Sequence, residues 1–365
     1  MKKLLVTALA SATAVVCLGA PGAQSSAGSR DVRMLRTPIA AGISADGSLA
    51  VVATGCGPRE YELYAWNPLR RSVVSLARRR ERRCYGSSTG EGIWEAAIAG
   101  HRVAWVAFAG GNYRQSWLLT ASTRRPLATV QLTDMKDRNT DSGVGDWVGN
   151  VHGDGSLLVF NTWSLCEKSE DTDSCPPGSP PGFHIYNENL WRIVGRHKRL
   201  ILASPDEMTV LAVAAGRILV RRADGSLELR GADGSLLHAF PYRRREVRAA
   251  LLDASELVVL DRASGLTWRV YDPASGDQKR MFRAQKNAEA QDVERGLLVY
   301  TVGRVVHVLR LADRRQKTFV APAVPRPDYP LFVQAALEPS GLFYSYPVRS
   351  EGRVRFVPFN QIRFR

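Results

Sequence analysis

Histidine and cysteine are scarce in this sequence, with six histidines and five cysteines among 365 residues. None of them stands in the Cys-x-x-Cys, His-x-His or His-x-x-x-His spacing that brings neighbouring ligands to one metal ion, so a local zinc motif is excluded. A functional histidine also needs partners that the adjacent residues do not supply. We therefore interpret all six as structural: His101, His152, His184, His197, His238 and His307.

Long apolar runs are equally rare, and the one that stands out lies at the N-terminus. A basic start is followed by an apolar stretch too short and too rich in small residues for a membrane span, and then by Pro-Gly-Ala-Gln-Ser-Ser-Ala-Gly. This predicts a secretory signal peptide over residues 1–27. A lipoprotein is the alternative, but its signal requires a small residue where Val16 precedes Cys17. We expect a mature chain, residues 28–365, that is secreted or held in the periplasm or cell envelope, with no transmembrane segment.

Four cysteines remain after Cys17, and an even number in an exported chain favours disulfides. Four cysteines permit three pairings, of which proximity in sequence favours Cys56 with Cys84 and Cys166 with Cys175. The first pair would close a loop of about 27 residues and contribute on the order of 3 kcal/mol by chain entropy, whereas the second would mainly rigidify one loop.

Two kinds of hairpin alternate along the mature chain. One places a small-residue strand, a tight turn and a strongly apolar strand in succession; the other joins two alternating strands through a turn of Asn, Asp, Gly, Ser or Pro. The first kind begins at Ala40, Ala96, Gly149, Leu211, Arg248, Asp292 and Gln334. The second begins at Tyr64, Trp117, His184, Leu227, Trp268 and His307. Together they predict a repeat of four antiparallel strands, a period typical of β-propellers.

The turns Ser-Ala-Asp-Gly-Ser, His-Gly-Asp-Gly-Ser and Glu-Pro-Ser-Gly resemble those of exported bacterial β-propellers of the WD-repeat and TolB-like type. The resemblance covers the whole mature chain and implies one all-β domain of four-stranded blades. The Trp-Asp dipeptide that closes WD repeats is missing, so the subfamily is left unassigned.

The last repeat is one strand short, because the chain ends after its third strand. An alternating stretch from Arg30 to Pro38 precedes the first repeat and has no partner there. A strand from one terminus that completes the blade of the other removes two exposed sheet edges. We therefore predict seven blades closed by the N-terminal strand, with six or eight as alternatives, in a chain that we expect to be monomeric.

In such a blade, the connection between strands two and three emerges on the same face as the connection to the next blade. The long connections of blades one to three therefore share one face, whereas those of blades four to six are short. Rigid scaffolds present functional loops, so we predict that this face binds a ligand; tolerated insertions are the alternative. A cationic rim on this face would consist of Arg78, Arg79, Arg80, Arg82 and Arg83.

An acidic loop on the same face raises the possibility of calcium. Asp137, Asn139 and Asp141 have the alternate spacing of successive oxygen ligands. However, Ser142 stands where the calcium loop has glycine, and no glutamate follows at the required distance. A solvated acidic turn is therefore the default interpretation, and calcium is the one cofactor considered.

The formal charge of +15 favours attraction to acidic partners, but the arginines are spread over every blade, so a solvated basic surface is the default interpretation. The arginine clusters lack interleaved aromatics, so we expect no specific nucleic-acid binding. The sequence favours a binding or scaffold module for a protein or for an anionic glycan or envelope polymer. The alternative is an enzyme, a hydrolase or lyase acting on a sugar or lactone, with its active site at the propeller axis. Carboxylates converging on the axis would favour the enzyme.

Overall fold

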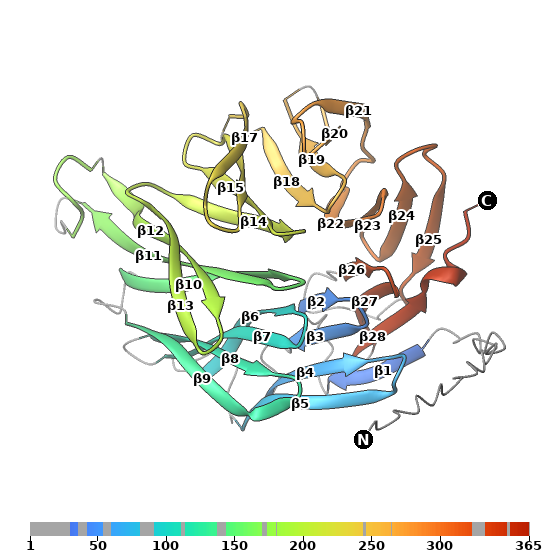
Figure 1. Cartoon of the computed structure of the whole chain (residues 1–365), viewed down its shortest axis with the longest axis horizontal. Helices are drawn as coiled ribbons and strands as arrows, with labels where there is room; N and C mark the ends of the chain where they lie inside the picture. The colour runs from blue at the N-terminus through green and yellow to red at the C-terminus, as the bar shows by residue number, and fades with distance from the viewer. Residues whose placement is uncertain are drawn as a thin grey trace, which may run out of the picture.

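The computed structural model forms a ring of seven four-stranded antiparallel sheets (Figure 1). It describes residues 30–35, 42–53, 60–80, 91–110, 114–136, 144–169, 174–179, 181–243, 246–263, 265–322, 333–348 and 351–364. The predicted propeller and its seven blades are confirmed. The predicted signal peptide lies outside the described residues, and within them no helix is long and apolar enough to cross a membrane.

Each blade is a meander whose first strand lies toward the ring centre. Blade 1 contains β2 (Gly42–Asp46), β3 (Leu49–Ala53), β4 (Glu60–Asn67) and β5 (Ser72–Arg80). Blade 2 contains β6 (Glu91–Ala99), β7 (Arg102–Gly110), β8 (Arg114–Ser122) and β9 (Arg125–Lys136). Blade 3 contains β10 (Gly145–Asp154), β11 (Leu157–Lys168), β12 (Gly182–Val194) and β13 (His197–Ser204). Blade 4 contains β14 (Met208–Ala214), β15 (Arg217–Arg222), β16 (Leu227–Gly231) and β17 (Leu236–Phe240).

Blade 5 contains β18 (Val247–Leu252), β19 (Leu257–Asp261), β20 (Thr267–Tyr271) and β21 (Gln278–Arg283). Blade 6 contains β22 (Glu289–Glu294), β23 (Leu297–Val302), β24 (Val305–Arg310) and β25 (Gln316–Val320). Blade 7 contains β26 (Gln334–Glu338), β27 (Gly341–Val348), β28 (Glu351–Pro358) and β1 (Arg30–Leu35), and is followed by the 3-10 helix η1 (Phe359–Gln361).

The core lies between neighbouring blades, because the second strand of a blade is buried on both faces. Every residue of β19 is buried, for example. Trp268 of blade 5 packs in one cluster with Leu298 and Tyr300 of blade 6. The first strands carry small residues because they crowd at the axis. At Gly153 an added Cβ atom would lie 2.5 Å from the Ile98 carbonyl oxygen, so only glycine fits there.

The ring closes as the sequence predicted. β1 pairs antiparallel with β28, with Arg30 opposite Phe356 and Val32 opposite Val354. The final blade is thus built from both ends of the described chain, which leaves the ring without the two edges that an open seventh blade would expose.

The two faces of the ring differ in their connections. We call the side with the turns between first and second strands the turn face, and the opposite side the connection face. The connection face carries the long links at 81–90, between β5 and β6, and at 169–181, between β11 and β12. Those of blades 4 and 5 are short, as predicted, but the link from β25 to β26, residues 321–333, is long. Blade 6 therefore departs from the predicted asymmetry.

Candidate functional site

The predicted arginine rim falls partly within the described chain. Arg78, Arg79 and Arg80 end the outer strand β5, and Arg82 and Arg83 lie outside the described residues. The strand register places Glu62 opposite Arg78 and Glu60 opposite Arg80.

The predicted calcium ligands Asp137, Asn139 and Asp141 lie outside the described residues, as do Cys56 and Cys84. Among the residues that the structure does describe, no group of three or more His, Cys, Asp or Glu side chains is placed to hold a metal ion. The calcium site remains a prediction.

Residues 86–90 read Gly-Ser-Ser-Thr-Gly, the spacing of a hydrolase nucleophile elbow. That motif works at a sharp turn from a strand into a helix at the top of an α/β sheet. Here the segment links β5 to the strand β6 and lies outside the described residues. The spacing alone is therefore no evidence for a nucleophilic serine.

A disulfide joins Cys166 to Cys175, with their Cα atoms 5.0 Å apart. Cys166 lies near the end of β11, so the bond ties the link between β11 and β12 to its own hairpin. The link is tied further by the Ser174 hydroxyl, which donates to the Glu167 carbonyl oxygen at 3.0 Å. Phe183, at the start of β12, is 55% exposed beside this link. Blade 3 thus presents a braced projection on the connection face.

We expect replacement of Cys166 and Cys175 by serine to loosen this projection without opening the ring. The loop is short and peripheral, so the chain-entropy contribution of about 2–3 kcal/mol acts mainly on local opening. Limited proteolysis should cut between Lys168 and Gly182 several-fold faster in the double variant, with little change in the thermal midpoint. A fall in midpoint as large as that caused by removing a strand would contradict this local role.

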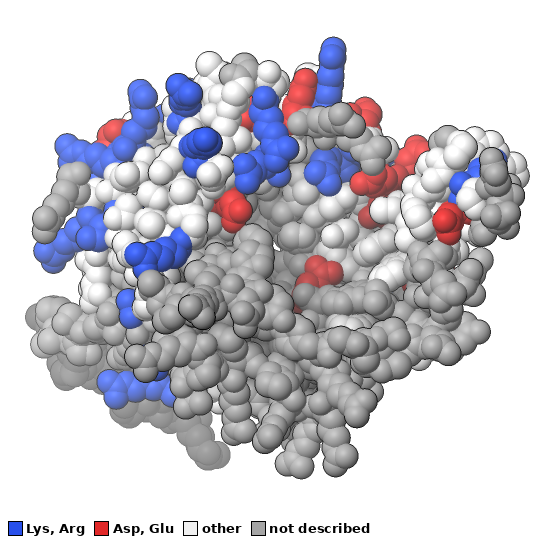
Figure 2. All heavy atoms as spheres, turned by 180° about the vertical axis from the view of Figure 1, so that it is seen from behind, with Lys and Arg blue, Asp and Glu red and all other residues white. Residues whose placement is uncertain are grey.

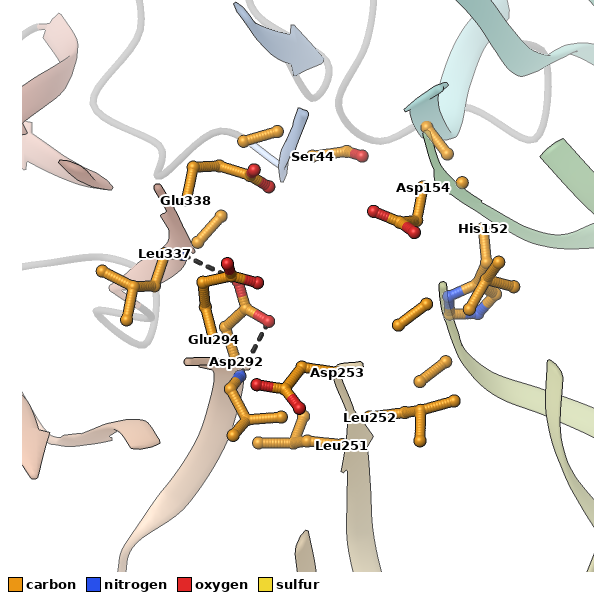
Figure 3. A pocket seen from close by; sticks show the side chains of 18 of the residues that line it. Ser44, His152, Asp154, Leu251, Leu252, Asp253, Asp292, Glu294, Leu337 and Glu338 are labelled. Atoms are coloured by element: carbon orange, nitrogen blue, oxygen red, sulfur yellow. Dashed lines mark hydrogen bonds between the residues drawn. The ribbon is translucent and has the colours of Figure 1, made fainter. Parts of the chain in front are cut away.

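The first strands of the blades surround an axial cavity of about 400 Å³ (Figure 3). Five carboxylates line it, and they come from blades 3, 5, 6 and 7. They are Asp154, Asp253, Asp292, Glu294 and Glu338. Asp154, Glu294 and Glu338 are the last residues of β10, β22 and β26, Asp253 directly follows β18, and Asp46 ends β2 in the same way. Five of the seven blades therefore place an acidic residue where the first strand meets the turn face.

Most of these carboxylates connect one blade to the next. The Gly47 N–H of blade 1 donates to Glu338 Oε2 of blade 7 at 2.8 Å. The Leu337 N–H donates to Asp292 Oδ2 of blade 6 at 2.7 Å, across the next junction (Figure 3). The Ala215 N–H of blade 4 donates to Asp154 Oδ2 of blade 3 at 2.8 Å.

Asp46 extends the same pattern, since its Oδ2 accepts from the Gly100 N–H at 2.5 Å and from the Gly155 N–H at 2.8 Å. One carboxylate of blade 1 thus contacts backbone of blades 2 and 3. Charge-assisted hydrogen bonds of this kind are stronger than those between neutral groups. The carboxylates at the axis therefore hold the ring together.

Two other carboxylates are engaged within their own blade. Asp253 is 4% exposed, and its Oδ1 accepts from the backbone N–H groups of Ser255 and Glu256, each at 2.6 Å. Glu294 forms an ion pair with Arg295, at 3.2 Å between Oε1 and Nε.

The cavity raises the pKa of several of these groups. Burial, followed by the like charge of Asp292, raises the pKa of Glu338 to about 9. Burial also raises the pKa of Asp292 to about 7 and that of Glu294 to about 7, with nearby carboxylates adding to both. Burial and nearby carboxylates thus favour the protonated forms, so Glu338 and part of Asp292 and Glu294 hold protons near neutral pH.

His152 stands on the other side of the cavity and is the one predicted structural histidine near the axis (Figure 3). Burial lowers its pKa to about 4, while a hydrogen bond with the Val210 backbone opposes that shift. At neutral pH the imidazole is therefore uncharged and engaged by the adjacent blade, which is consistent with a structural role.

The sequence carries a signal for the five carboxylates of the cavity and Asp46, which we call the acidic ring. Each acidic residue directly precedes turn residues, as in Asp46-Gly47, Asp154-Gly155 and Glu338-Pro339. The Asp-Gly pairs predict hairpin turns, which they do form. An acidic residue ends or directly follows the first strand in five of the seven repeats, and this recurrence indicates that the carboxylates meet at the axis.

No family model and no curated protein matches this sequence. Among solved structures, a chain in the crystal structure of the mitotic checkpoint complex is 14% identical, with 96% of this chain and 99% of that chain covered and a TM-score of 0.51. The computationally designed Ika8 protein (11% identity, 88% and 97% covered, TM-score 0.47) and Saccharomyces cerevisiae Sqt1 (9%, 90% and 98%, TM-score 0.46) are also similar. At these identities the likeness concerns a WD40-like propeller fold alone, and the TolB-like, exported type remains a prediction.

Proposed function

We propose that this chain is an exported binding or scaffold module whose connection face receives a protein or an anionic envelope polymer. The observation that carries the proposal is the braced projection of blade 3. A disulfide and the bonds of Ser174 hold an extended hairpin tip on the connection face, next to an exposed phenylalanine. A loop that was merely a tolerated insertion would not need a disulfide and further hydrogen bonds to hold its shape.

The engagement of the axial carboxylates also supports a binding role. A general acid or base must be able to reach a substrate proton. Asp154, Asp292 and Glu338 are instead used as hydrogen-bond acceptors between blades. Their removal would first weaken the ring.

The test is binding of the mature chain to anionic polymers and to envelope proteins, with salt as the first variable. We expect association with acidic partners to weaken as salt rises from low to moderate concentration. Replacing Arg78, Arg79, Arg80, Arg82 and Arg83 with serine should reduce affinity for partners of the connection face. The matched control removes the same charge elsewhere, at exposed positions of blades 2, 3 and 5: Arg124, Arg125, Arg196, Arg280 and Arg283. Equal losses in both variants would show only a general effect of net charge.

A second candidate function, a hydrolase or lyase of sugars or lactones, is favoured by one observation. Carboxylates with raised pKa values converge on one cavity, and Glu294 accepts no backbone hydrogen bond from another described residue. Turnover of a lactone or glycoside that is abolished in Glu294→Gln, while folding is unchanged, would establish it. Absence of turnover across both substrate classes would reject it.

A further inference from the structure

We infer that the axial cavity binds a linear diamine, an organic dication whose two ammonium groups are joined by methylenes. The cavity lies at the centre of the ring and is a different site from the connection face, so this inference goes beyond the proposed function. Its volume of about 400 Å³ lies in the range of sites that enclose small molecules. Its charge, its open oxygens and its two acidic sides each point to this class of ligand.

The cavity carries an excess of negative charge. Five carboxylates line it, whereas none of the described lining residues is Lys or Arg. Two cations lie beside it and have partners of their own: Arg295 pairs with Glu294 and is 65% exposed, and Arg217 donates to the Ala254 carbonyl oxygen at 3.3 Å. Seen from behind, Lys and Arg lie mainly on the outer part of the ring, and acidic atoms are visible beside a central hollow (Figure 2). Like charges in one cavity repel, so the cavity favours a cationic ligand.

Several carboxylates at the cavity have one oxygen that accepts nothing from the described residues. Asp253 is only 4% exposed, and its Oδ1 accepts from the Ser255 and Glu256 N–H groups, but no described residue donates to its Oδ2. Asp154 and Glu338 likewise use only Oδ2 and Oε2 for their bonds to the neighbouring blades. A buried carboxylate oxygen normally has a donor. These oxygens therefore mark where the ammonium groups of a ligand would donate.

The acidic groups lie on two sides of the cavity. Asp253, Asp292, Glu294 and Glu338 come from blades 5 to 7 and lie together, whereas Asp154 of blade 3 lies across from them (Figure 3). Blade 4 stands between the two sides, and its lining residues 211–214 read Leu-Ala-Val-Ala. A diamine matches this arrangement, because each ammonium meets carboxylates while the methylenes lie along the apolar wall.

The same separation distinguishes a diamine from a metal ion. Calcium and magnesium require about six to eight oxygens within roughly 2.0–2.6 Å of one point. Among the described residues, no three His, Cys, Asp or Glu side chains are placed to hold one ion. A monoamine carries a single charge and can satisfy only one side. Two charges at the ends of one chain reach both sides.

Binding of a diamine should release protons. Burial raises the pKa of Glu338 to about 9 and those of Asp292 and Glu294 to about 7. A nearby ammonium favours the ionised carboxylates, so affinity should rise between about pH 6 and pH 8, where an alkylamine stays charged. The titratable and charged groups at the cavity are Asp46 of blade 1, His152 and Asp154 of blade 3, Asp253 of blade 5, Asp292, Glu294 and Arg295 of blade 6, and Glu338 of blade 7.

The experiment is isothermal titration calorimetry of the mature chain with diaminopropane, putrescine, cadaverine and diaminohexane. The monoamines butylamine and hexylamine, Mg²⁺ and Ca²⁺ serve as competing classes. Asp154→Asn and Asp253→Asn each remove one open oxygen and keep a carbonyl oxygen for the backbone hydrogen bonds. The matched control is Asp277→Asn, which removes one negative charge from an exposed turn. Titrations in two buffers of different ionisation enthalpy measure the protons released.

We expect one diamine to bind at least about tenfold more tightly than the matching monoamine, and each of the two cavity variants to weaken it about tenfold. The control should stay within about twofold of the wild type, and wild-type binding should release protons at neutral pH. Equal binding of diamines and monoamines, tighter binding of Mg²⁺ or Ca²⁺, unchanged affinity in both cavity variants, or no diamine binding would each overturn the inference. If a cavity variant fails to fold, the comparison of amines and the proton release in the wild type decide it. None of these outcomes bears on binding at the connection face, which has its own variants.

Discussion

A chain that starts at Ala40 should unfold at a markedly lower temperature than one that starts at Arg30. Removing β1 leaves β28 with an unpaired edge and the seventh blade with three strands. At about 1 kcal/mol for each lost backbone hydrogen bond, the ladder contributes roughly 4–5 kcal/mol. For a chain of this size that corresponds to a fall of about 6 °C in the thermal midpoint. Differential scanning calorimetry measures it directly.

The control for this prediction is the pair of chains that start at Ala27 and at Arg30. Both keep β1, so their midpoints should agree within about 1–2 °C. A chain starting at Ala40 with the same midpoint as these two would show that β1 does not close the ring. We also expect the shortened chain to associate at high concentration, because an exposed strand edge pairs readily with another chain.

The fold was predictable because each repeat contains an apolar strand that must be buried, and these strands recur along the chain. Strands such as β19 and β23 are buried on both faces, so they must be continuously apolar, and their spacing gives the blade count. The incomplete last repeat and the unpartnered stretch at Arg30 together indicated the closure. The link from β25 to β26, residues 321–333, is long where a short connection of blade 6 is predicted.

The axial site was less predictable for a physical reason. Asp154 and Glu338 are far apart in sequence, and only the closed ring brings their carboxylates to one cavity. Such a residue both begins a turn and places its carboxylate at the axis. The local sequence pattern indicates the turn but not the position at the axis. Cross-strand register was equally hidden, since Glu62 opposite Arg78 depends on how β4 and β5 pair.

The acidic ring makes the free energy of unfolding depend on pH. In the unfolded chain, carboxylates release their protons near pH 4, whereas in the folded ring Asp292 and Glu294 retain them to about pH 7 and Glu338 to about pH 9. Between those values the folded state binds more protons than the unfolded state, so the free energy of unfolding decreases as pH rises from about 5 to about 9. We expect the urea midpoint to be higher at pH 5.5 than at pH 9.

Two amide substitutions separate the cost of charge from the loss of hydrogen bonds. Glu338 accepts one backbone N–H, and a glutamine oxygen can accept it equally well. Glu338→Gln should therefore stabilise the protein, and this stabilisation should be about 2 kcal/mol larger at pH 9 than at pH 7. The free energy of unfolding of the variant should accordingly depend less on pH. Asp292 accepts from Leu337 on one oxygen and from Val293 on the other. Asparagine has one carbonyl oxygen, so Asp292→Asn loses one of these hydrogen bonds, at a cost of about 1–3 kcal/mol. It should therefore stabilise the protein at pH 9 less than Glu338→Gln does.

The matched control is Asp277→Asn, which removes one negative charge from an exposed turn of blade 5. It should leave both the midpoint and the slope against pH close to those of the wild type. Urea titrations at pH 5.5, 7 and 9 on the four proteins supply the comparison. If Glu338→Gln lowers stability at pH 9, or if the wild type is most stable at pH 9, then burial and neighbouring carboxylates do not raise the pKa of the axial groups. If instead the two amide variants diverge as expected, the acidic ring acts both as the link between blades and as the source of the pH dependence.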